Sequence, residues 1–554
     1  MPTIEVSYQD ICSLIGQTIP KKEFQEKAVL FAKGEIDEWE GDSLKIDIKD
    51  TNRPDLWSAE GIAREIQGRY GNPGLPEYSV KKSDLKVIVD KKMKNIRPCT
   101  VCAVVKNLKI TEHVLSQIIQ LQEKVSISFG RNRKEVAIGI YDLCKIKPPV
   151  KFTAFKPDQL KFTPLDFKEE LTLKEILEKH PKGKEYGFLL SGLSEYPIFI
   201  DSANEVLSMP PIINSEYTGK VTKETRNVFI ECSGFNLKFL LPALNTIVCA
   251  LADRGGEIFS ADIIYPDKKL TTPDLKPKTF SVNANTTNKL SGLNLQPEQI
   301  CTLLEQARYK TKTKGNKIDV IYPAYRQDIM HERDVIEDVI ISYGFNNIEP
   351  VVPRLPTTGG QEKIEEFSYL TEEIMTGLGF QQTMSYTLTN KESLFRKMNL
   401  PEKSIVEIEN PISSNWSVFR NSLLPSLLEF LSKNKHREYP QRIFETGDIV
   451  ITDETKETKT KNIRNLACAV THPATGYEEI SSCLDAFFLA LGKTYELKET
   501  AHPSFIQGRA AEIIVNRKSV GIIGEIHPKV LNNWELENPV AAWEINLESI
   551  LSLF

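Results

Sequence analysis

Short runs of β-branched and aromatic residues alternate with turns rich in glycine, proline and asparagine through the first half of the chain. This pattern predicts β-strands. The strand candidates are residues 3–6, 44–48, 97–105, 188–190, 198–200, 227–231 and 258–264. Two helices are expected among them. One follows Pro54, which suits a first helical turn, and the other covers residues 237–254.

The second half of the chain mixes longer helical patterns with strands. A compact stretch predicts a strand at 280–282, a helix after Pro297, a strand at 318–321 and then an amphipathic helix. The apolar stripe of that last helix is Val335, Ile336, Val339 and Ile340. Beyond it we expect a helix at 364–378 and strands at 511–515, 519–524 and 541–547, so the fold class is multidomain α+β.

Clusters of proline and glycine suggest where the domains divide. They lie at 71–76 and 350–360, and a lysine-rich, proline-containing stretch at 265–278 reads as a linker. We therefore expect an N-terminal α+β domain at 1–85, a mixed α+β domain at 90–270, a small domain with an acidic helix at 279–350 and a further α+β domain at 361–554. A chain of 554 residues is long enough for several cores.

Composition narrows the class of protein. Hydrophobic residues make up 40%, charged residues 26%, and the net charge is -5, so neither disorder nor a strongly basic nucleic-acid surface is expected, and any RNA contact is local. The first residues lack a signal-peptide pattern and no stretch could span a bilayer, which predicts a cytoplasmic protein with no membrane partner. The nine cysteines show no zinc spacing, and we interpret Cys99 and Cys102 as core residues.

The strongest candidate chemistry is a cluster of carboxylates on the amphipathic helix. Asp334, Glu337 and Asp338 stand at i, i+3 and i+4, and Asp328 precedes them by six residues. Clustered carboxylates repel one another unless a cation lies among them, and hard oxygen ligands suit Mg²⁺. A solvated acidic helix face is the alternative interpretation.

Seven segments carry a resemblance to a known family. The chain resembles, from end to end, the β subunit of phenylalanyl-tRNA synthetase of the shorter archaeal and eukaryotic type. The segments lie at residues 50–61, 136–143, 209–214, 224–231, 325–328, 333–338 and 524–528. The first reads Asp-Thr-Asn-Arg-Pro-Asp-Leu-Trp-Ser-Ala-Glu-Gly and the last Gly-Glu-Ile-His-Pro.

The resemblance implies a tetramer of two α and two β subunits that attaches phenylalanine to its tRNA with ATP as substrate. It implies a C-terminal antiparallel domain like that of class II synthetases but without catalytic residues. Arg442-Ile-Phe-Glu445 is consistent with this, because it is not the Arg-x-Glu that grips ATP. The isolated chain is therefore not expected to aminoacylate. The resemblance also implies a structural Mg²⁺ at Asp328, Asp334, Glu337 and Asp338, one per β subunit and shared with the α subunit.

A second implied activity is editing, the hydrolysis of tyrosine wrongly attached to the phenylalanine tRNA. A pocket that hydrogen-bonds the phenol would discard tyrosine and spare phenylalanine. Glu216 matches the family's tyrosine-sensing glutamate. The family pattern Gly-x-His-Asp-Leu-Asp reads Gly139-Ile-Tyr-Asp-Leu-Cys144 here, so Tyr141 and Asp142 are further candidates and the histidine is absent. This departure leaves open the alternative of a non-editing scaffold and tRNA-docking subunit. A separate alternative is a self-sufficient ATP-using ligase, which the missing ATP-binding arginines argue against.

Overall fold

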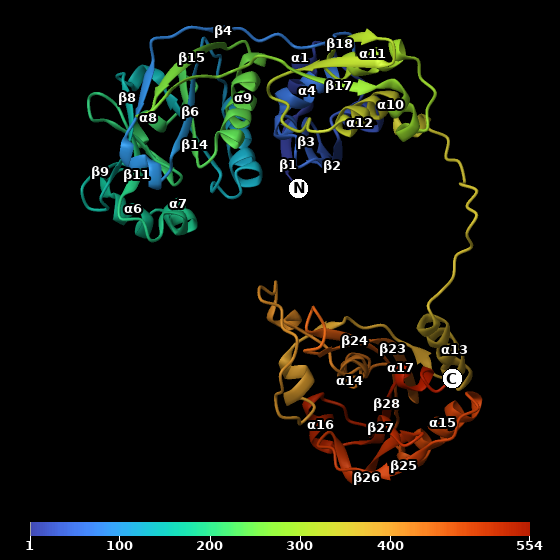
Figure 1. The fold of residues 1–554 in the computed structure, drawn as a ribbon. Helices are drawn as coiled ribbons and strands as arrows, with labels where there is room; N and C mark the ends of the chain where they lie inside the picture. Colours follow the sequence, from blue (N-terminus) through green and yellow to red (C-terminus); the bar gives the residue numbers. More distant parts are fainter. Residues whose placement is uncertain (1) are drawn as a thin grey trace. The chain divides into compact units, whose positions relative to one another are not determined.

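The structure, a computed structural model, describes residues 2–554 (Figure 1). The chain divides into two compact units, the first ending at Val352 and the second covering Pro353–Phe554. Both units mix helices with largely antiparallel sheets, as the α+β prediction requires. No helix within residues 2–554 combines the length and the apolar character needed to cross a membrane.

The first unit opens with a small sheet of order β1-β3-β2, in which β3 pairs antiparallel with both neighbours. Its strands are β1 (Thr3–Ser7), β2 (Gly34–Glu40) and β3 (Ser43–Ile48). The accompanying helices are α1 (Tyr8–Ile15), α2 (Lys21–Glu23), α3 (Val29–Phe31) and α4 (Ala59–Gln67). Pro54 begins a short 3-10 turn before α4, at the place where the helix start was predicted.

A large sheet of order β13-β12-β11-β8-β5-β15-β6-β14-β7 forms the middle of the unit, with β4 and β16 also paired to β15. The strands on one side are β5 (Lys86–Val89), β8 (Val150–Phe155), β11 (Tyr196–Ile200), β12 (Val206–Met209) and β13 (Ile213–Asn214). Those on the other side are β4 (Val80–Lys81), β6 (Cys99–Lys106), β7 (Val136–Asp142), β14 (Val228–Gly234), β15 (Glu257–Ile264) and β16 (Lys269–Thr272). A separate pair is β9 (Lys161–Phe162) with β10 (Leu171–Thr172).

The two faces of this sheet enter different cores because successive side chains of a strand point to opposite sides. Helix α9 (Leu237–Asp253) packs on the face of β6 and β14, as Figure 1 shows, together with α5 (Glu112–Lys124). The opposite face of β6, β7 and β14 packs against β5, β8, β11 and β12. The remaining helices here are α6 (Leu173–Lys179), α7 (Pro181–Tyr186) and α8 (Glu216–Gly219).

The first unit closes with a three-stranded antiparallel sheet, order β17-β19-β18, packed against three helices. Its elements are β17 (Lys278–Asn283), β18 (Lys310–Lys314), β19 (Lys317–Tyr322), α10 (Ala284–Ser291), α11 (Pro297–Gln306) and α12 (Glu332–Tyr343). Helix α12 is the predicted acidic helix. Val335, Ile336 and Val339 of its predicted apolar stripe are buried.

The second unit is built on a seven-stranded sheet of order β20-β23-β24-β28-β27-β26-β25. Its strands are β20 (Gln381–Gln382), β23 (Gln441–Thr452), β24 (Thr460–Thr471), β25 (Glu496–Glu499), β26 (Phe505–Val515), β27 (Lys518–Ile526) and β28 (Val540–Asn546), beside the pair β21 (Leu388–Thr389) and β22 (Val418–Phe419). Its helices are α13 (Lys363–Gly377), α14 (Leu424–Lys433), α15 (Tyr477–Ala490), α16 (Pro528–Asn533) and α17 (Leu547–Leu551). Separate apolar clusters involve α13 and α15 on the one hand and α14 and α16 on the other.

Two local predictions were wrong. Residues 188–190 form part of a 3-10 helix, Gly187–Leu190, rather than a strand, because a three-residue apolar run does not by itself distinguish the two. The stretch 265–278 is not a free linker, since β16 within it pairs antiparallel with β15. The other predicted strands and helices lie within, or within a residue or two of, observed elements.

Candidate functional site

Helix α12 begins at a polar cap that uses one of the four predicted metal ligands. The Asp334 carboxylate accepts hydrogen bonds from the backbone N–H of Met330 at 2.8 Å and of His331 at 2.7 Å. The His331 side chain accepts from the backbone of Arg333 in return. Asp334 is therefore engaged in starting the helix, the usual role of an acidic side chain in a first turn.

Asp328 and Asp338 meet around one buried arginine. Arg326 donates from Nε and Nη2 to the two oxygens of Asp328, at 2.8 and 2.6 Å, and Nη2 also reaches Asp338 Oδ2 at 2.8 Å. Tyr309 donates to the same Asp338 oxygen at 2.6 Å. The paired, planar geometry is that of a bidentate arginine-carboxylate contact.

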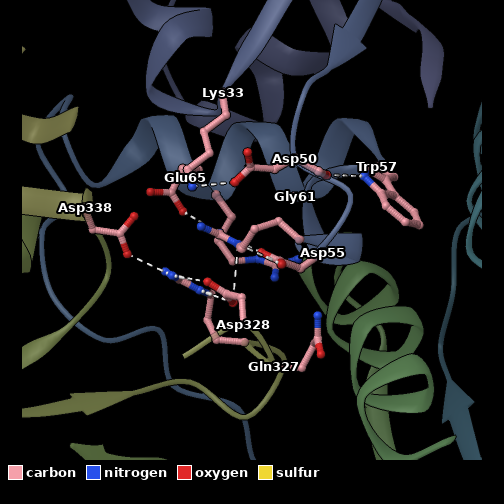
Figure 2. A network of polar contacts seen from close by, with 12 residues as sticks. Lys33, Asp50, Asp55, Trp57, Gly61, Glu65, Gln327, Asp328 and Asp338 are labelled. Atoms are coloured by element: carbon pink, nitrogen blue, oxygen red, sulfur yellow. Dashed lines mark hydrogen bonds and ion pairs between the residues drawn. The ribbon is translucent and has the colours of Figure 1, made fainter. Parts of the chain in front are cut away.

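A second buried arginine comes from the N-terminal part of the chain. Its carboxylate neighbours Asp55, Glu65 and Asp328 are labelled in Figure 2. Arg53 donates to Asp55 at 3.0 and 2.8 Å and to Glu65 at 3.1 Å, and it lies 3.9 Å from Asp328. Gly61 makes room for this turn, because a Cβ there would lie 1.7 Å from the Asp55 carbonyl oxygen. Through these contacts Arg53 fixes the loop that precedes α4.

Lys33 adds a third cation at the edge of the network. It pairs with Asp50 and lies 3.1 Å from Glu337 Oε2, whose side chain is 51% exposed. Burial would raise the pKa of Asp338, but the charges of Arg326, Arg53 and Lys33 hold it below its ordinary value. Asp328, Glu337 and Asp338 are thus each paired with one of the protein's own cations.

The four predicted magnesium ligands consequently do not converge. Asp328 and Asp338 are buried and turned to Arg326, Asp334 caps the helix, and Glu337 is exposed. Within residues 2–554, no three side chains of the metal-binding kinds gather in a way that could hold an ion. As they stand in this chain, these residues do not fit a four-carboxylate magnesium site.

A pocket of about 170 Å³ opens beside the large sheet of the first unit. It is lined by parts of α5, β7, β14, the Pro210-Pro211 turn and the loop of Leu165 and Asp166. The histidine that lines it, His180, accepts from the backbone of Lys182 through Nδ1 and contacts the Leu165 carbonyl through Nε2 at 3.1 Å. Both ring nitrogens are occupied, so His180 is not a free base.

Glu231 is a buried carboxyl group that lines the pocket. It lies on β14, directly opposite Gly139 of β7, and is 2% exposed. Oε1 takes a hydrogen bond from the Tyr141 hydroxyl at 3.1 Å, whereas Oε2 meets no hydrogen-bond partner within residues 2–554. Burial raises the pKa of Glu231 to about 8 even though the charge of Arg97 opposes this, so the group is protonated at neutral pH.

Arg97 and two hydroxyls extend this polar chain. Arg97 Nε donates to Ser233 Oγ at 3.1 Å, and burial lowers the pKa of Arg97 to about 10. The Tyr141 hydroxyl also lies 2.7 Å from Ser208 Oγ. The Tyr141 hydroxyl thus links β7 to β14 and β12, while Arg97, which precedes β6, bonds Ser233 further along β14.

The sequence-predicted editing residues separate in space. Tyr141 bonds the buried Glu231, but Glu216 and Asp142 do not line the pocket. Glu216 pairs with Lys220 and accepts from the backbone N–H of Asp166 at 2.8 Å, so it holds the loop at the pocket's rim. Asp142 accepts from Cys144 N and Thr225 Oγ1 at the end of β7.

Sequence reasoning missed Glu231, Ser208 and Arg97. A signal for Glu231 was present: a lone carboxylate within the apolar strand 228–232, at an alternating position shared with Phe229 rather than with Ile230. A charged residue on a buried strand face requires a partner or a function.

Comparisons with known proteins agree along the whole chain. Residues 88–241 match the B3/4 domain, residues 280–345 the tRNA synthetase B5 domain, and residues 348–547 the phenylalanyl tRNA synthetase beta chain CLM domain. Two relatives named phenylalanine–tRNA ligase beta subunit, from Pyrococcus abyssi and Pyrococcus furiosus, are 52% and 51% identical over 99% of this chain and 100% of their own length. A crystal structure of an N-terminal fragment of the phenylalanyl-tRNA synthetase β subunit from Pyrococcus horikoshii is 51% identical with a TM-score of 0.61, over 62% of this chain and 100% of the fragment.

Proposed function

Because the chain belongs to the family of phenylalanyl-tRNA synthetase β subunits, we propose that it works with an α subunit to attach phenylalanine to its tRNA with ATP. The observation that carries this is the 52% identity over 99% of the chain and 100% of the relative. The proposed assembly is the α₂β₂ tetramer, and the proposed location is the cytoplasm. The four-domain division at 1–85, 90–270, 279–350 and 361–554 is part of the same proposal.

The second unit is proposed as the class II synthetase-like domain that supports the α subunit without catalysis. The segment Arg442–Glu445 lies on β23, and both of its charged residues are used internally. Glu445 pairs with Arg420 at 2.6 Å, with both side chains 3% exposed, and Arg442 pairs with Glu479 at 2.6 Å. Glu445 is therefore not free to contact a nucleotide, and Arg442 already has a carboxylate partner, which supports placing ATP binding on the α subunit.

Editing is proposed for the pocket that Glu231 lines. A phenol entering it would come beside Glu231, whose Oε2 is buried and has no hydrogen-bond partner within residues 2–554. A phenylalanyl side chain would leave that buried oxygen unpaired, and an unpaired buried polar group costs about 1–3 kcal/mol. A site built on a hydrogen bond to a substrate hydroxyl therefore separates the two amino acids better than an apolar pocket does.

A Mg²⁺ ion is proposed only for the α/β complex, not for this chain alone. The family uses ATP and Mg²⁺, but the acidic helix of this chain by itself does not present the four-carboxylate site. The predicted ion at Asp328, Asp334, Glu337 and Asp338 remains a prediction for the α/β complex, where ligands from the α subunit would add to this set.

The experiment is to co-express the chain with its α subunit and to measure phenylalanine charging and hydrolysis of Tyr-tRNA in the complex. Glu231→Gln should leave charging unchanged and reduce hydrolysis, while Glu216→Gln, a surface carboxylate changed in the same way, should have a smaller effect. Charging without any hydrolysis would favour the non-editing scaffold and tRNA-docking subunit. A complex that neither forms nor charges would refute the assignment.

A further inference from the structure

The Tyr141 hydroxyl contacts Glu231 and is shielded from solvent. The residue is fully buried, and its hydroxyl lies 3.1 Å from Glu231 Oε1 and 2.7 Å from Ser208 Oγ. It therefore joins β7 to β14 and β12 through two short polar contacts. Burial raises the pKa of Tyr141 well above its ordinary value, so the phenol keeps its proton.

Neighbouring groups confine the ring of Tyr141. It stacks on Phe229 with ring centroids 5.8 Å apart and an interplanar angle of 29°. On its own strand it lies across Gly139, where a Cβ would come within 2.1 Å of the hydroxyl oxygen and 2.8 Å of Glu231 Oε1. A side chain at position 139 would therefore block the contact between Tyr141 and Glu231, so the position of Tyr141 depends on the glycine.

The contact with Tyr141 makes the two carboxyl oxygens of Glu231 different from each other. One is held by an internal phenol, and the other faces no hydrogen-bond partner within residues 2–554 while the residue lines the pocket. A carboxyl group anchored through one oxygen cannot turn freely, so the second oxygen keeps one position for a ligand. Preorganisation of this kind lowers the cost of ordering the group when a ligand binds.

We propose that Tyr141 is a positioning residue of the pocket: it fixes Glu231 through Oε1 so that Oε2 receives the phenol of a tyrosyl group. The inference rests on the proposed editing function and deepens it. The Tyr141 side chain spans from β7 to β14 and reaches the glutamate directly. Tyr141 touches neither the reacting ester nor water in this role, since it acts through Glu231.

The test compares Tyr141→Phe with Tyr265→Phe in the α/β complex. Tyr265 belongs to the same apolar core, is 9% exposed, and has its hydroxyl bonded to the Thr100 backbone at 2.7 and 3.0 Å, away from Glu231. Each change removes one buried hydroxyl from the same core. A purely structural role predicts equal effects of the two changes on hydrolysis.

Kinetics of Tyr-tRNA hydrolysis separate the outcomes. We expect Tyr141→Phe to raise KM about tenfold, the factor given by a lost hydrogen bond of ordinary strength, with a smaller change in kcat, and to reduce the preference for Tyr-tRNA over Phe-tRNA. Tyr265→Phe should leave that preference unchanged. Equal effects of the two variants, with an active wild type, would overturn the inference alone. A wild-type complex that charges phenylalanine but never hydrolyses Tyr-tRNA would overturn the proposed editing function, and the inference with it.

Discussion

Replacing Glu231 by glutamine should make the stability of the large sheet less dependent on pH. Glutamine keeps the shape and the contact with Tyr141 but cannot ionise. The pKa of Glu231 is about 8 in the folded chain against 4.5 for the free group, so between these values the folded state holds a proton that the unfolded state releases. Wild-type stability therefore falls as pH rises from 4.5 to 8, and the variant lacks this loss.

The size of the effect follows from the shift. Each pH unit inside the window is worth about 1.4 kcal/mol, so the variant should gain about 2.7 kcal/mol over the wild type between pH 5.5 and 7.5. This free energy corresponds to roughly a hundredfold change in the hydrogen-exchange protection factor of the variant relative to that of the wild type. Below pH 4.5 Glu231 is protonated in both the folded and the unfolded wild type, and the pH-dependent difference from the variant disappears.

Hydrogen exchange of peptides covering β7 and β14 is the suitable assay, because it reports local opening in a chain of several domains. Wild type and variant are compared at the same pH, so the intrinsic exchange rate cancels. Glu216→Gln is the matched control. A Lys220 hydrogen bond lowers the pKa of Glu216 despite partial burial, so its stabilisation is lost only below pH 4.5 and nothing should change between pH 5.5 and 7.5. A Glu231→Gln difference that stays constant over this range would refute the reasoning.

Three further predictions concern the network around α12. Arg326→Met leaves Asp328 and Asp338 buried without their main partner and should destabilise the first unit by about 3–5 kcal/mol in denaturant unfolding, so a cost under about 1 kcal/mol would contradict the pairing. Gly61→Ala drives a methyl group into the Asp55 carbonyl and should cost at least about 1–3 kcal/mol, with Gly377→Ala, where a Cβ meets nothing within 4 Å, as the control. The isolated chain should hold no stoichiometric Mg²⁺ after dialysis, as measured by elemental analysis. One ion per chain, lost on Asp334→Asn, would show that the carboxylates gather without the α subunit.

Local pattern was enough for most elements of this chain. The helix predicted at 237–254 is observed at Leu237–Asp253, and the acidic helix with its buried stripe is α12. Such segments are long and strongly periodic, so neighbouring residues alone decide their conformation. The run 188–190 is too short for its period to be read, and there the prediction failed.

The two candidate sites depended on contacts that no local pattern contains. The spacing of Asp334, Glu337 and Asp338 places them on one helix. Arg53 and Lys33, which help to neutralise Asp338, lie roughly 300 residues earlier in the chain. Likewise, alternation on β14 puts Glu231 on the inner face, while its partner Tyr141 comes from β7 and its pocket is closed by the Pro210-Pro211 turn. The sequence by itself determined the α+β elements, the family resemblance and the residue types available for chemistry. Only the tertiary structure decided which charges meet, because the energy of a buried carboxylate depends on the groups packed around it and not on its neighbours in sequence.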